Sequence, residues 1–239
     1  MLVQIYNAIL YQPLLNLLVF FYNLVPAHDL GLAIILLTVL IKAILWPFFA
    51  QSIRAQKVMQ NLQPKLDELK AKYKDNQEKL GPAIMELYKQ EKVNPLSSCF
   101  PMLIQLPFLI AVYQVFRKGI SNGSLTLVYS FLSNPGQLNT MALGFLDLSK
   151  PSPVLAVLAG LAQFWQSKQM LARNKNAKAN PNEKANMINK QMMYIFPVVT
   201  VFIGWSLPGG LTFYWLLFTL FGVLQQYFVF KKLDKAEQK

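Results

Sequence analysis

One lysine stands inside an apolar segment that is long enough to cross a membrane. Residues 30–50, LGLAIILLTVLIKAILWPFFA, contain Lys42 and no other charged residue. An α-helix rises about 1.5 Å per residue, so about 20 residues cover the hydrocarbon layer of a bilayer. A charged side chain at that depth costs roughly 2.5 kcal/mol or more and is usually retained for a function. Lys42 is therefore the first candidate for a functional residue.

Two interpretations of Lys42 are open. Its long side chain could extend to the headgroups on one side of the membrane. Alternatively, Lys42 could face a hydrated cavity, because no Asp or Glu occurs within the apolar segments to neutralise it. Nearby polar residues favour the cavity, since Thr38 lies one turn away on the same helix face. Other apolar segments contain Gln105, Gln163, Gln166, Ser167, Trp215, Gln225 and Gln226. A cation in such a cavity would attract a negatively charged group.

Sequence patterns for covalent chemistry and metal binding are missing. There is no G-x-x-x-x-G-K-[ST], no H-E-x-x-H and no G-x-S-x-G. Cys99 is the only cysteine and His28 the only histidine, so neither an internal disulfide nor a His/Cys metal site is expected. We therefore expect no enzyme activity, no cofactor and no metal.

The composition indicates an integral membrane protein. The chain is 54% hydrophobic and 14% charged, whereas about a quarter of the residues in a soluble domain are charged. The net charge is +12, but the basic residues lie between apolar segments and form no continuous patch. Anionic headgroups and the excess of basic residues in cytoplasmic loops explain this charge better than nucleic acid does. We expect the lipid bilayer as a partner, and no DNA.

The predicted fold class is an all-α integral membrane protein with five transmembrane helices. The spans are expected at 28–50, 95–118, 153–170, 191–206 and 211–230. The remaining segments are a cytoplasmic helical hairpin (51–94), an outer loop (119–152), a cytoplasmic loop (171–190), an outer turn (207–210) and a cytoplasmic tail (231–239).

Residues 1–27 allow two interpretations. The segment is apolar, but it contains several Asn and Gln residues, and Pro13 would break or kink a helix. It is either a further span or an amphipathic helix that lies in the outer interface. The recurring polar residues favour the interfacial helix.

The hairpin at 51–94 is predicted from its charge and its apolar stripes. It holds nine Lys/Arg and six Asp/Glu. The first stripe consists of Met59, Leu62, Leu66, Leu69 and Tyr73, and the second of Leu80, Ile84, Leu87 and Tyr88. Spacings of three and four residues place each stripe on one helix face, where the two helices would pack together. A solvated loop with some helix is the alternative.

Basic residues predict the orientation. The hairpin has nine, residues 171–190 with the flanking Lys168 have six, and the tail has four. The other side has only Arg117, Lys118 and Lys150. Because basic loops stay in the cytoplasm, the N-terminus is expected outside and the C-terminus in the cytoplasm.

Several segments resemble the YidC membrane protein insertases, which are related to the mitochondrial oxidase-assembly and thylakoid insertases. The most specific is NPLSSCFPMLIQLPFLIAVY at 94–113. The others are LIKAILWPF (40–48), ELYKQEKVNP (86–95), FLDLSKPSP (145–153), FWQSKQM (164–170) and GGLTFYWLLFTLFGVLQQYF (209–228). The resemblance covers nearly all of the chain, and is to the short form without a large periplasmic domain.

The resemblance implies a hydrophilic groove that opens to the cytoplasm and to lipid but is closed outside. It places Lys42 where most members have a groove arginine, and it assigns polar groove positions to Thr38, Gln105, Gln166 and Trp215. A lysine keeps the charge but lacks the planar fork of arginine. Substrates would slide along the second and fifth spans, with expected contacts from Met102, Leu103, Leu106, Phe108, Leu216 and Leu217. Packing against lipid is the alternative for each of these side chains.

The function implied is that of an insertase in the bacterial plasma (inner) membrane, which moves small membrane proteins into the bilayer without chemical energy of its own. Nascent membrane proteins are the expected substrates. The Sec translocon, the signal recognition particle receptor and the ribosome are further candidate partners. From the residues alone, a channel or transporter with a cationic intramembrane site is the alternative, and a structural subunit of a translocase is a third interpretation.

Overall fold

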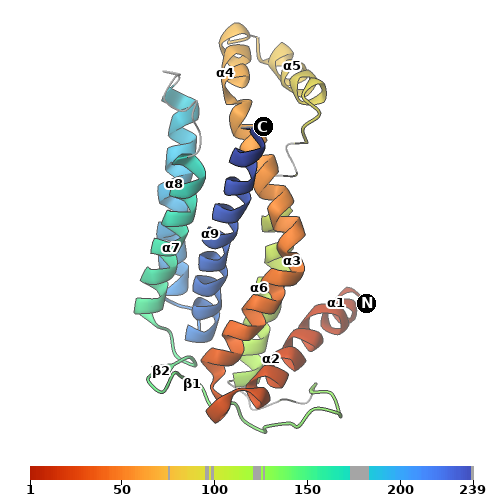
Figure 1. Cartoon of the computed structure of the whole chain (residues 1–239), viewed down its shortest axis with the longest axis vertical. Helices are drawn as coiled ribbons and strands as arrows, with labels where there is room; N and C mark the ends of the chain where they lie inside the picture. Colours follow the sequence, from red (N-terminus) through yellow and green to blue (C-terminus); the bar gives the residue numbers. More distant parts are fainter. Residues whose placement is uncertain are drawn as a thin grey trace.

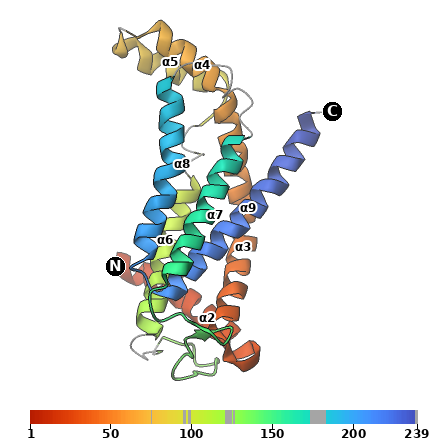
Figure 2. The same cartoon turned by 90° about the vertical axis from the view of Figure 1, so that its left-hand side faces the viewer.

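Long helices that run side by side dominate the computed structural model, which describes residues 1–74, 76–94, 97, 100–120, 125, 127–172 and 183–237. They are α3 (Leu30–Asn61), α6 (Phe100–Gln114), α7 (Pro153–Ala172), α8 (Glu183–Gly204) and α9 (Gly209–Glu237). Figures 1 and 2 show them lying along the longest axis of the molecule. In this bundle α7 packs against α8 and α9, and α3 packs against α9 and α6. The fold is mostly helical, as predicted.

Three of the described helical segments are long and apolar enough to cross a membrane: Val3–Leu24, Leu30–Asn61 and Gly209–Lys235. Met193–Gly204 is a shorter apolar helix. The number of spans therefore stays a prediction, although the expected boundaries at 153–170 and 211–230 lie within α7 and α9. Half of the expected cytoplasmic loop at 171–190 lies outside the residues whose structure is described, and residues 183–190 belong to α8.

The N-terminal segment is an almost unbroken helix that accommodates Pro13. It comprises α1 (Leu2–Tyr6), a π-helical turn η1 (Asn7–Tyr11) and α2 (Gln12–Leu24). Proline lacks an N–H and its ring crowds the preceding turn, so a widened π turn directly before it relieves that conflict. The segment runs obliquely across one end of the bundle (Figure 1), where α2 buries Leu15, Leu18 and Val19 against α3. Its position relative to the membrane stays a prediction.

Helix α3 continues well beyond the expected end of the first span at residue 50. It passes through Pro47 and ends at Asn61. Packing against α9 stabilises this extension, because Ala50 and Ile53 are buried against Val229 and Phe230. The first arm of the expected hairpin therefore begins as a direct continuation of the long helix.

The hairpin itself contains α4 (Gln63–Lys72), α5 (Gln77–Gln90) and the end of α3. Leu62 and Leu66 of the first stripe are buried, whereas no residue of α5 is. The second stripe is half-buried and forms the more protected face of α5. An ion pair between Lys65 and Glu91 joins the two arms. Helices α4 and α5 therefore lie where the two arms were expected, with one packed more deeply than the other, and their arrangement as a cytoplasmic hairpin stays a prediction.

A short β-hairpin lies at the opposite end of the bundle. Strands β1 (Met141–Ala142) and β2 (Leu146–Asp147) pair antiparallel, and the turn between them contains Gly144 with a φ of +79°. The sequence predicted a loop here but no strands. A segment with two paired residues in each strand is too short to show an alternating pattern.

This β-hairpin is fixed to the start of α3 and to α2. Asp29 caps α3 by accepting a hydrogen bond from Leu32 N at 3.0 Å, and its other oxygen accepts one from Leu143 N. The Tyr22 hydroxyl accepts from Asn139 N at 2.7 Å. Gly31 permits the approach, because a Cβ there would lie 2.6 Å from the Cβ of Ala142.

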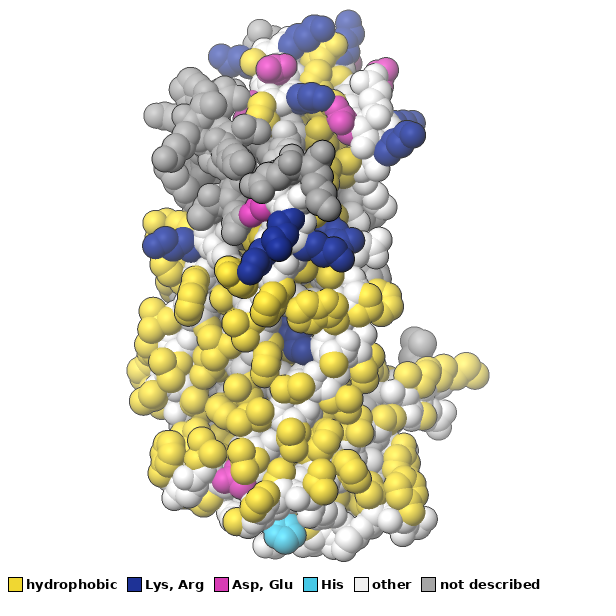
Figure 3. Space-filling model, in the orientation of Figure 1, with side chains coloured by type: hydrophobic (Ala, Val, Ile, Leu, Met, Phe, Trp, Pro, Cys, Tyr) yellow, Lys and Arg dark blue, Asp and Glu magenta, His cyan; other side chains and the backbone are white. Residues whose placement is uncertain are grey.

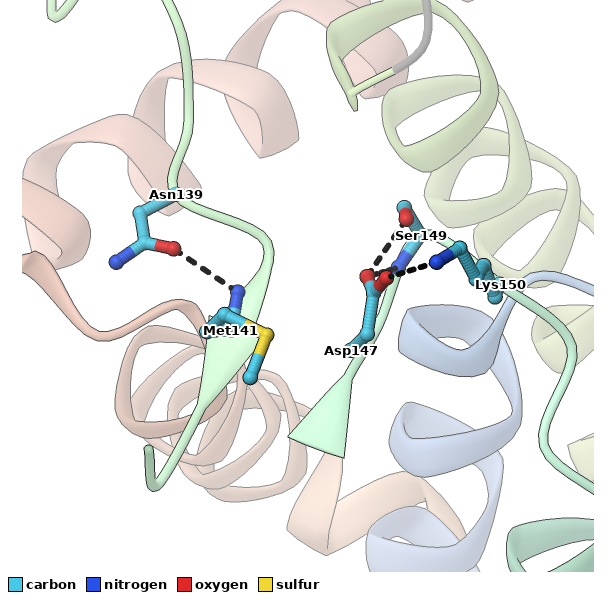
Figure 4. Close-up of polar contacts among 5 residues, drawn as sticks. All are labelled: Asn139, Met141, Asp147, Ser149 and Lys150. Atoms are coloured by element: carbon cyan, nitrogen blue, oxygen red, sulfur yellow. Dashed lines mark hydrogen bonds and ion pairs between the residues drawn. The ribbon is translucent and has the colours of Figure 1, made fainter. Parts of the chain in front are cut away.

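The residues after β2 dock on the start of α9. Asp147 Oδ1 accepts from Ser149 N at 3.0 Å and from Ser149 Oγ at 2.6 Å, while Lys150 Nζ lies 3.3 Å from Oδ2 (Figure 4). These contacts, led by the Ser149 hydroxyl, lower the pKa of Asp147 to about 2. The turn presents the carbonyls of Leu148 and Lys150 to the N–H groups of Gly210 and Gly209. We call residues 139–150, with Tyr22, Asp29, Gly31, Gly209 and Gly210, the terminal clamp.

The surface of the bundle is strongly apolar. Figure 3 shows hydrophobic side chains over most of this face, with Lys and Arg side chains gathered toward the end that carries α4 and α5. Large side chains such as Phe202 (80% exposed), Leu161 and Ile44 point away from the protein interior. Exposed apolar area on this scale indicates contact with lipid. The chain is therefore a multi-pass membrane protein.

Candidate functional site

Lys42 lies buried between α3 and α9, with only 6% of its surface exposed. Its Nζ is 3.5 Å from the ring centroid of Phe218 and 4.6 Å from that of Phe49. Phe49 follows Lys42 by two turns of α3, so both side chains lie on one helix face, whereas Phe218 belongs to α9. Both distances are within the range of a cation–π contact. No described residue forms an ion pair or a hydrogen bond with the Lys42 ammonium.

A glycine on α9 makes room for a second donor beside Lys42. A Cβ at Gly222 would lie 3.6 Å from Lys42 Nζ and would overlap Nε2 of Gln166, which comes from α7. Gly222 therefore lets side chains from α3 and α7 meet against the α9 backbone. An ammonium and an amide nitrogen are both donors, so together they offer a place for an acceptor such as a carboxylate or water. We call Lys42, Phe49, Gln166, Phe218 and Gly222 the Lys42 site.

Thr38 lies next to this site but has a local partner. The residue is fully buried, and its Oγ1 donates to the carbonyl of Ile34 at 2.7 Å. The hydroxyl proton is therefore used within α3, and only the lone pairs of the oxygen are available to another group.

Gln105 of α6 lies beside Tyr214 of α9, the residue that packs on Phe218 of the Lys42 site. Gln105 Oε1 and the Tyr214 hydroxyl are both buried without a hydrogen-bond partner in the described part of the chain, although the two side chains lie close together. The same holds for the side-chain oxygens of Gln169 in α7 and Gln226 in α9. Buried polar atoms in proteins are nearly always paired with protein or with ordered water. Unpaired atoms on α6, α7 and α9 therefore indicate a wet interior or a binding surface.

Trp215 is half-buried and contributes its backbone to the α9 network. Its carbonyl accepts a hydrogen bond from Thr219 Oγ1 at 2.9 Å. Two turns further along α9, Gln225 Nε2 donates to the carbonyl of Trp46 at 3.0 Å and ties α9 to α3. Gln225 thus faces α3, whereas the apolar residues Leu224 and Phe228 of α9 are exposed.

The expected sliding residues differ widely in exposure. Leu106 is exposed, Phe108 and Leu217 are half-buried against the main core, and Leu216 is buried within it. The backbones of Met102 and Leu103 belong to α6, but their side chains lie outside the described residues. Among the described side chains of this set, Leu106 is the best placed to touch a neighbouring molecule.

The described residues contain no group of three or more His, Cys, Asp or Glu side chains that could hold a metal ion. At the Lys42 site, the ammonium and the Gln166 amide offer binding by charge and hydrogen bonds.

Sequence reasoning missed Phe49, Phe218 and Gly222. The spacing of seven residues between Lys42 and Phe49 was a usable signal, because such residues share a helix face. Phe218 and Gly222 gave no local signal, since aromatic and small residues are frequent throughout the apolar segments.

The comparisons with known proteins agree with one another. A family model described as 60Kd inner membrane protein matches residues 20–237. The chain is 36% identical over 225 residues to a membrane protein insertase YidC of Fusobacterium nucleatum, covering 93% of this chain and 98% of that protein. It is 34% identical over 234 residues to a membrane protein insertase YidC of Geobacter metallireducens, covering 97% of this chain and 39% of the relative.

The fold also has a counterpart among solved structures. A structure titled "Active YidC insertase crystal structure with the first transmembrane domain resolved" matches with a TM-score of 0.62 and 23% sequence identity. The match covers 93% of this chain and 46% of that one. The chain thus spans nearly the whole Fusobacterium relative but less than half of the Geobacter relative and of the solved chain.

Proposed function

Since the chain belongs to the 60Kd inner membrane protein family, whose curated relatives are named membrane protein insertases, we propose that it moves small membrane proteins into the bilayer of the bacterial inner membrane. The observation that carries this proposal is the buried, uncompensated charge of Lys42, which lies beside a second donor, Gln166. Such a site suits a transient acidic or polar segment better than a permanent structural partner.

The mechanism rests on lowering the cost of a polar segment inside the membrane. A backbone group without a hydrogen-bond partner in hydrocarbon costs several kcal/mol, so a polar tail crosses lipid only slowly. The unpaired oxygens of Gln105, Gln169 and Gln226 provide acceptors within the bundle, and Lys42 provides a cation. A substrate tail would exchange water for these groups part of the way across. The transfer of its apolar helix into lipid then drives release, without catalysis or a bound energy source.

The path into lipid is proposed along α6 and α9. The exposed side chain of Leu106 and the half-buried side chains of Phe108 and Leu217 support this path. Leu216, Met102 and Leu103 are assigned to the same surface from the resemblance, and Leu216 would have to become accessible when a substrate separates the helices. Thr38 and Trp215 would line the polar side of the path.

The orientation and partners complete the proposal. The basic end with α4 and α5 would face the cytoplasm, so the C-terminus would lie there and the terminal clamp would lie outside. The hairpin would then receive nascent chains and could contact the ribosome, the signal recognition particle receptor or the Sec translocon. Its exposed charges, carried by two helices that pack loosely, support such a role.

The test is insertion by this chain alone. Proteoliposomes that contain only the purified chain should insert a small phage coat protein, and the chain should restore that insertion in cells depleted of their own insertase. Failure in both assays would refute the proposal. Insertion in cells but not in proteoliposomes would instead identify a subunit that needs the translocase.

A channel with an anion site is the second candidate, because an uncompensated buried cation also suits a permeating anion. It predicts chloride or phosphate flux across vesicles that contain the chain. Flux that disappears in Lys42→Ala, in vesicles that insert no protein, would favour the channel.

A further inference from the structure

We infer that Phe218, with Phe49 beside it, is the positioning residue for the Lys42 ammonium: its ring face binds the cation and holds it at depth without cancelling its charge. This role rests on the proposed function, in which the charge attracts acidic segments of substrates. The neighbouring aromatic residues, the position of the ammonium and the lack of a carboxylate each support it.

The ring of Phe218 is itself held firmly in place. The centroids of Phe49 and Phe218 are 5.6 Å apart with an interplanar angle of 68°, which is an edge-to-face arrangement. The Tyr214 centroid also lies 5.8 Å from that of Phe218. Phe218 and Phe49 are 9% and 8% exposed, and Tyr214 is fully buried. A buried ring that packs against two others has little freedom to turn its face away from the cation.

An aromatic partner of the Lys42 ammonium differs from an acidic partner because it leaves the site with a net charge. A carboxylate at 3–4 Å would neutralise Lys42, and the pair would offer little to a third group. A phenyl ring attracts the cation through its quadrupole and carries no net charge, so the ring does not cancel the charge of the ammonium. The described residues provide no acidic side chain at Lys42, and the Phe218 ring is the nearest group recorded at its Nζ.

The ring also opposes the tendency of lysine to extend toward the headgroups. A lysine stem is long and flexible, and in an apolar helix it usually carries the ammonium to the nearest polar surface. In this structure the ammonium instead points at α9, between Phe218 and Gly222. A desolvated cation–π contact shifts such an equilibrium by roughly tenfold or more. Removing the ring face should therefore move the charge out of the site while leaving Lys42 in the chain.

Graded fluorination of Phe218 tests this role with little change in shape. Phenylalanine with one, two or three ring fluorines is introduced at position 218 of the full chain, because each fluorine weakens the attraction of the ring for a cation. Proteoliposomes with each protein are given two versions of one small client, with either an acidic or a neutral tail. We expect insertion of the acid-tailed client to fall step by step, by roughly three- to tenfold for three fluorines. Insertion of the neutral client should stay within twofold.

Phe213 provides the matched control position. It lies on the same helix, is also 9% exposed and belongs to the same core, but no contact with a cation is recorded for it. The same fluorinated series at 213 should leave both clients unaffected. Phe218→Leu should resemble the trifluorinated ring, and Phe218→Tyr, which keeps a π face, should resemble the unsubstituted protein.

The outcomes separate this role from the proposed function. If the unsubstituted chain inserts neither client, the proposed function fails. If it inserts both but the series at 218 is flat, or if both clients are lost equally, Phe218 serves packing alone and the positioning role is wrong. Thermal unfolding of every variant in detergent shows whether a loss comes from misfolding, and the Phe218→Tyr variant keeps the test valid if Phe218→Leu does not fold.

Discussion

The terminal clamp and the Lys42 site belong to the same bundle, but they differ in whether their polar groups have hydrogen-bond partners. In the clamp, both carboxylate oxygens of Asp29 accept backbone N–H groups, and the Tyr22 hydroxyl and Asp147 are also hydrogen-bonded. At the Lys42 site, the described residues contact the ammonium only through ring faces, and on the same helix as Phe218 the Gln226 Oε1 has no partner among them.

This difference separates a region whose polar groups are paired from one whose polar groups can still gain partners. Satisfied polar groups favour one arrangement, because any movement leaves a group unpaired at a cost of about 1–3 kcal/mol. Unsatisfied groups are stabilised whenever water or another polar group reaches them. The contrast can be tested at both regions.

The largest effect is expected from removing the charge. Lys42→Ala should lower insertion of acid-tailed clients by about tenfold or more, since hydrogen bonds to charged groups contribute roughly 1.5–3 kcal/mol. Lys42→Arg keeps the charge and should stay active. The control is Lys168→Ala, because Lys168 is an exposed basic residue of α7 outside the site. Normal insertion of every client by Lys42→Ala would mean that the lysine only extends to the headgroups.

Filling the space at Gly222 should have the next largest effect. Gly222→Val would force Gln166 away from α9 and would crowd Lys42 Nζ. Overpacking of this kind lowers the free energy of unfolding by about 1–3 kcal/mol. Both thermal stability and insertion should fall. Gln166→Ala should restore part of the loss in the double variant, because it removes the clashing amide.

The control for this substitution is Gly81→Val in α5, where a Cβ would meet nothing within 4 Å. If Gly222→Val behaved like that control, the close meeting of Lys42, Gln166 and the α9 backbone would be wrong.

Loosening the clamp should affect stability more than binding. Asp29→Ala removes the N-cap of α3 and the bond to Leu143 N, and should cost about 2 kcal/mol in the free energy of unfolding. Hydrogen exchange of the Leu143 amide should become faster. Asn23→Ala, which loses one exposed bond to the carbonyl of Ser133, is the control and should have a smaller effect. Equal effects of the two variants would show that the clamp does not close this end.

The smallest effect concerns the pH dependence of the clamp. The pKa of Asp147 is lowered from 3.8 to about 2, so its hydrogen bonds stabilise the folded state fully above about pH 4 and are lost as the pH falls toward 2. Asp147→Asn should therefore lower Tm slightly at pH 6, and the difference should shrink between pH 4 and pH 2. A difference that is constant with pH would show that the carboxylate charge is not what the turn uses.

Much of the fold follows from local sequence patterns. The apolar segments predicted α3, α7 and α9, and the stripes at Leu62 and Leu66 and at Leu80 and Ile84 predicted helices in the segment that contains α4 and α5. These predictions succeed because a helix depends on hydrogen bonds and side-chain spacings within a few residues. The boundaries were less accurate: α3 continues to Asn61 because its extension packs on α9.

The site was only partly predictable. Lys42 was conspicuous because a charge in an apolar segment is costly, and Gln166 does meet it. Gln105 lies beside Tyr214, and its place in a groove stays a prediction. Which polar residues meet depends on the rotation and register of whole helices, and these are set by packing between segments far apart in the chain.

The sequence by itself determined that this is a helical membrane protein with one costly lysine, because hydropathy and charge are properties of the residues. The tertiary structure alone decided what surrounds that lysine: the ring of Phe218, the space at Gly222 and the amide of Gln166. None of these is marked locally, because a cation–π contact and a close helix approach exist only after α3, α7 and α9 have packed.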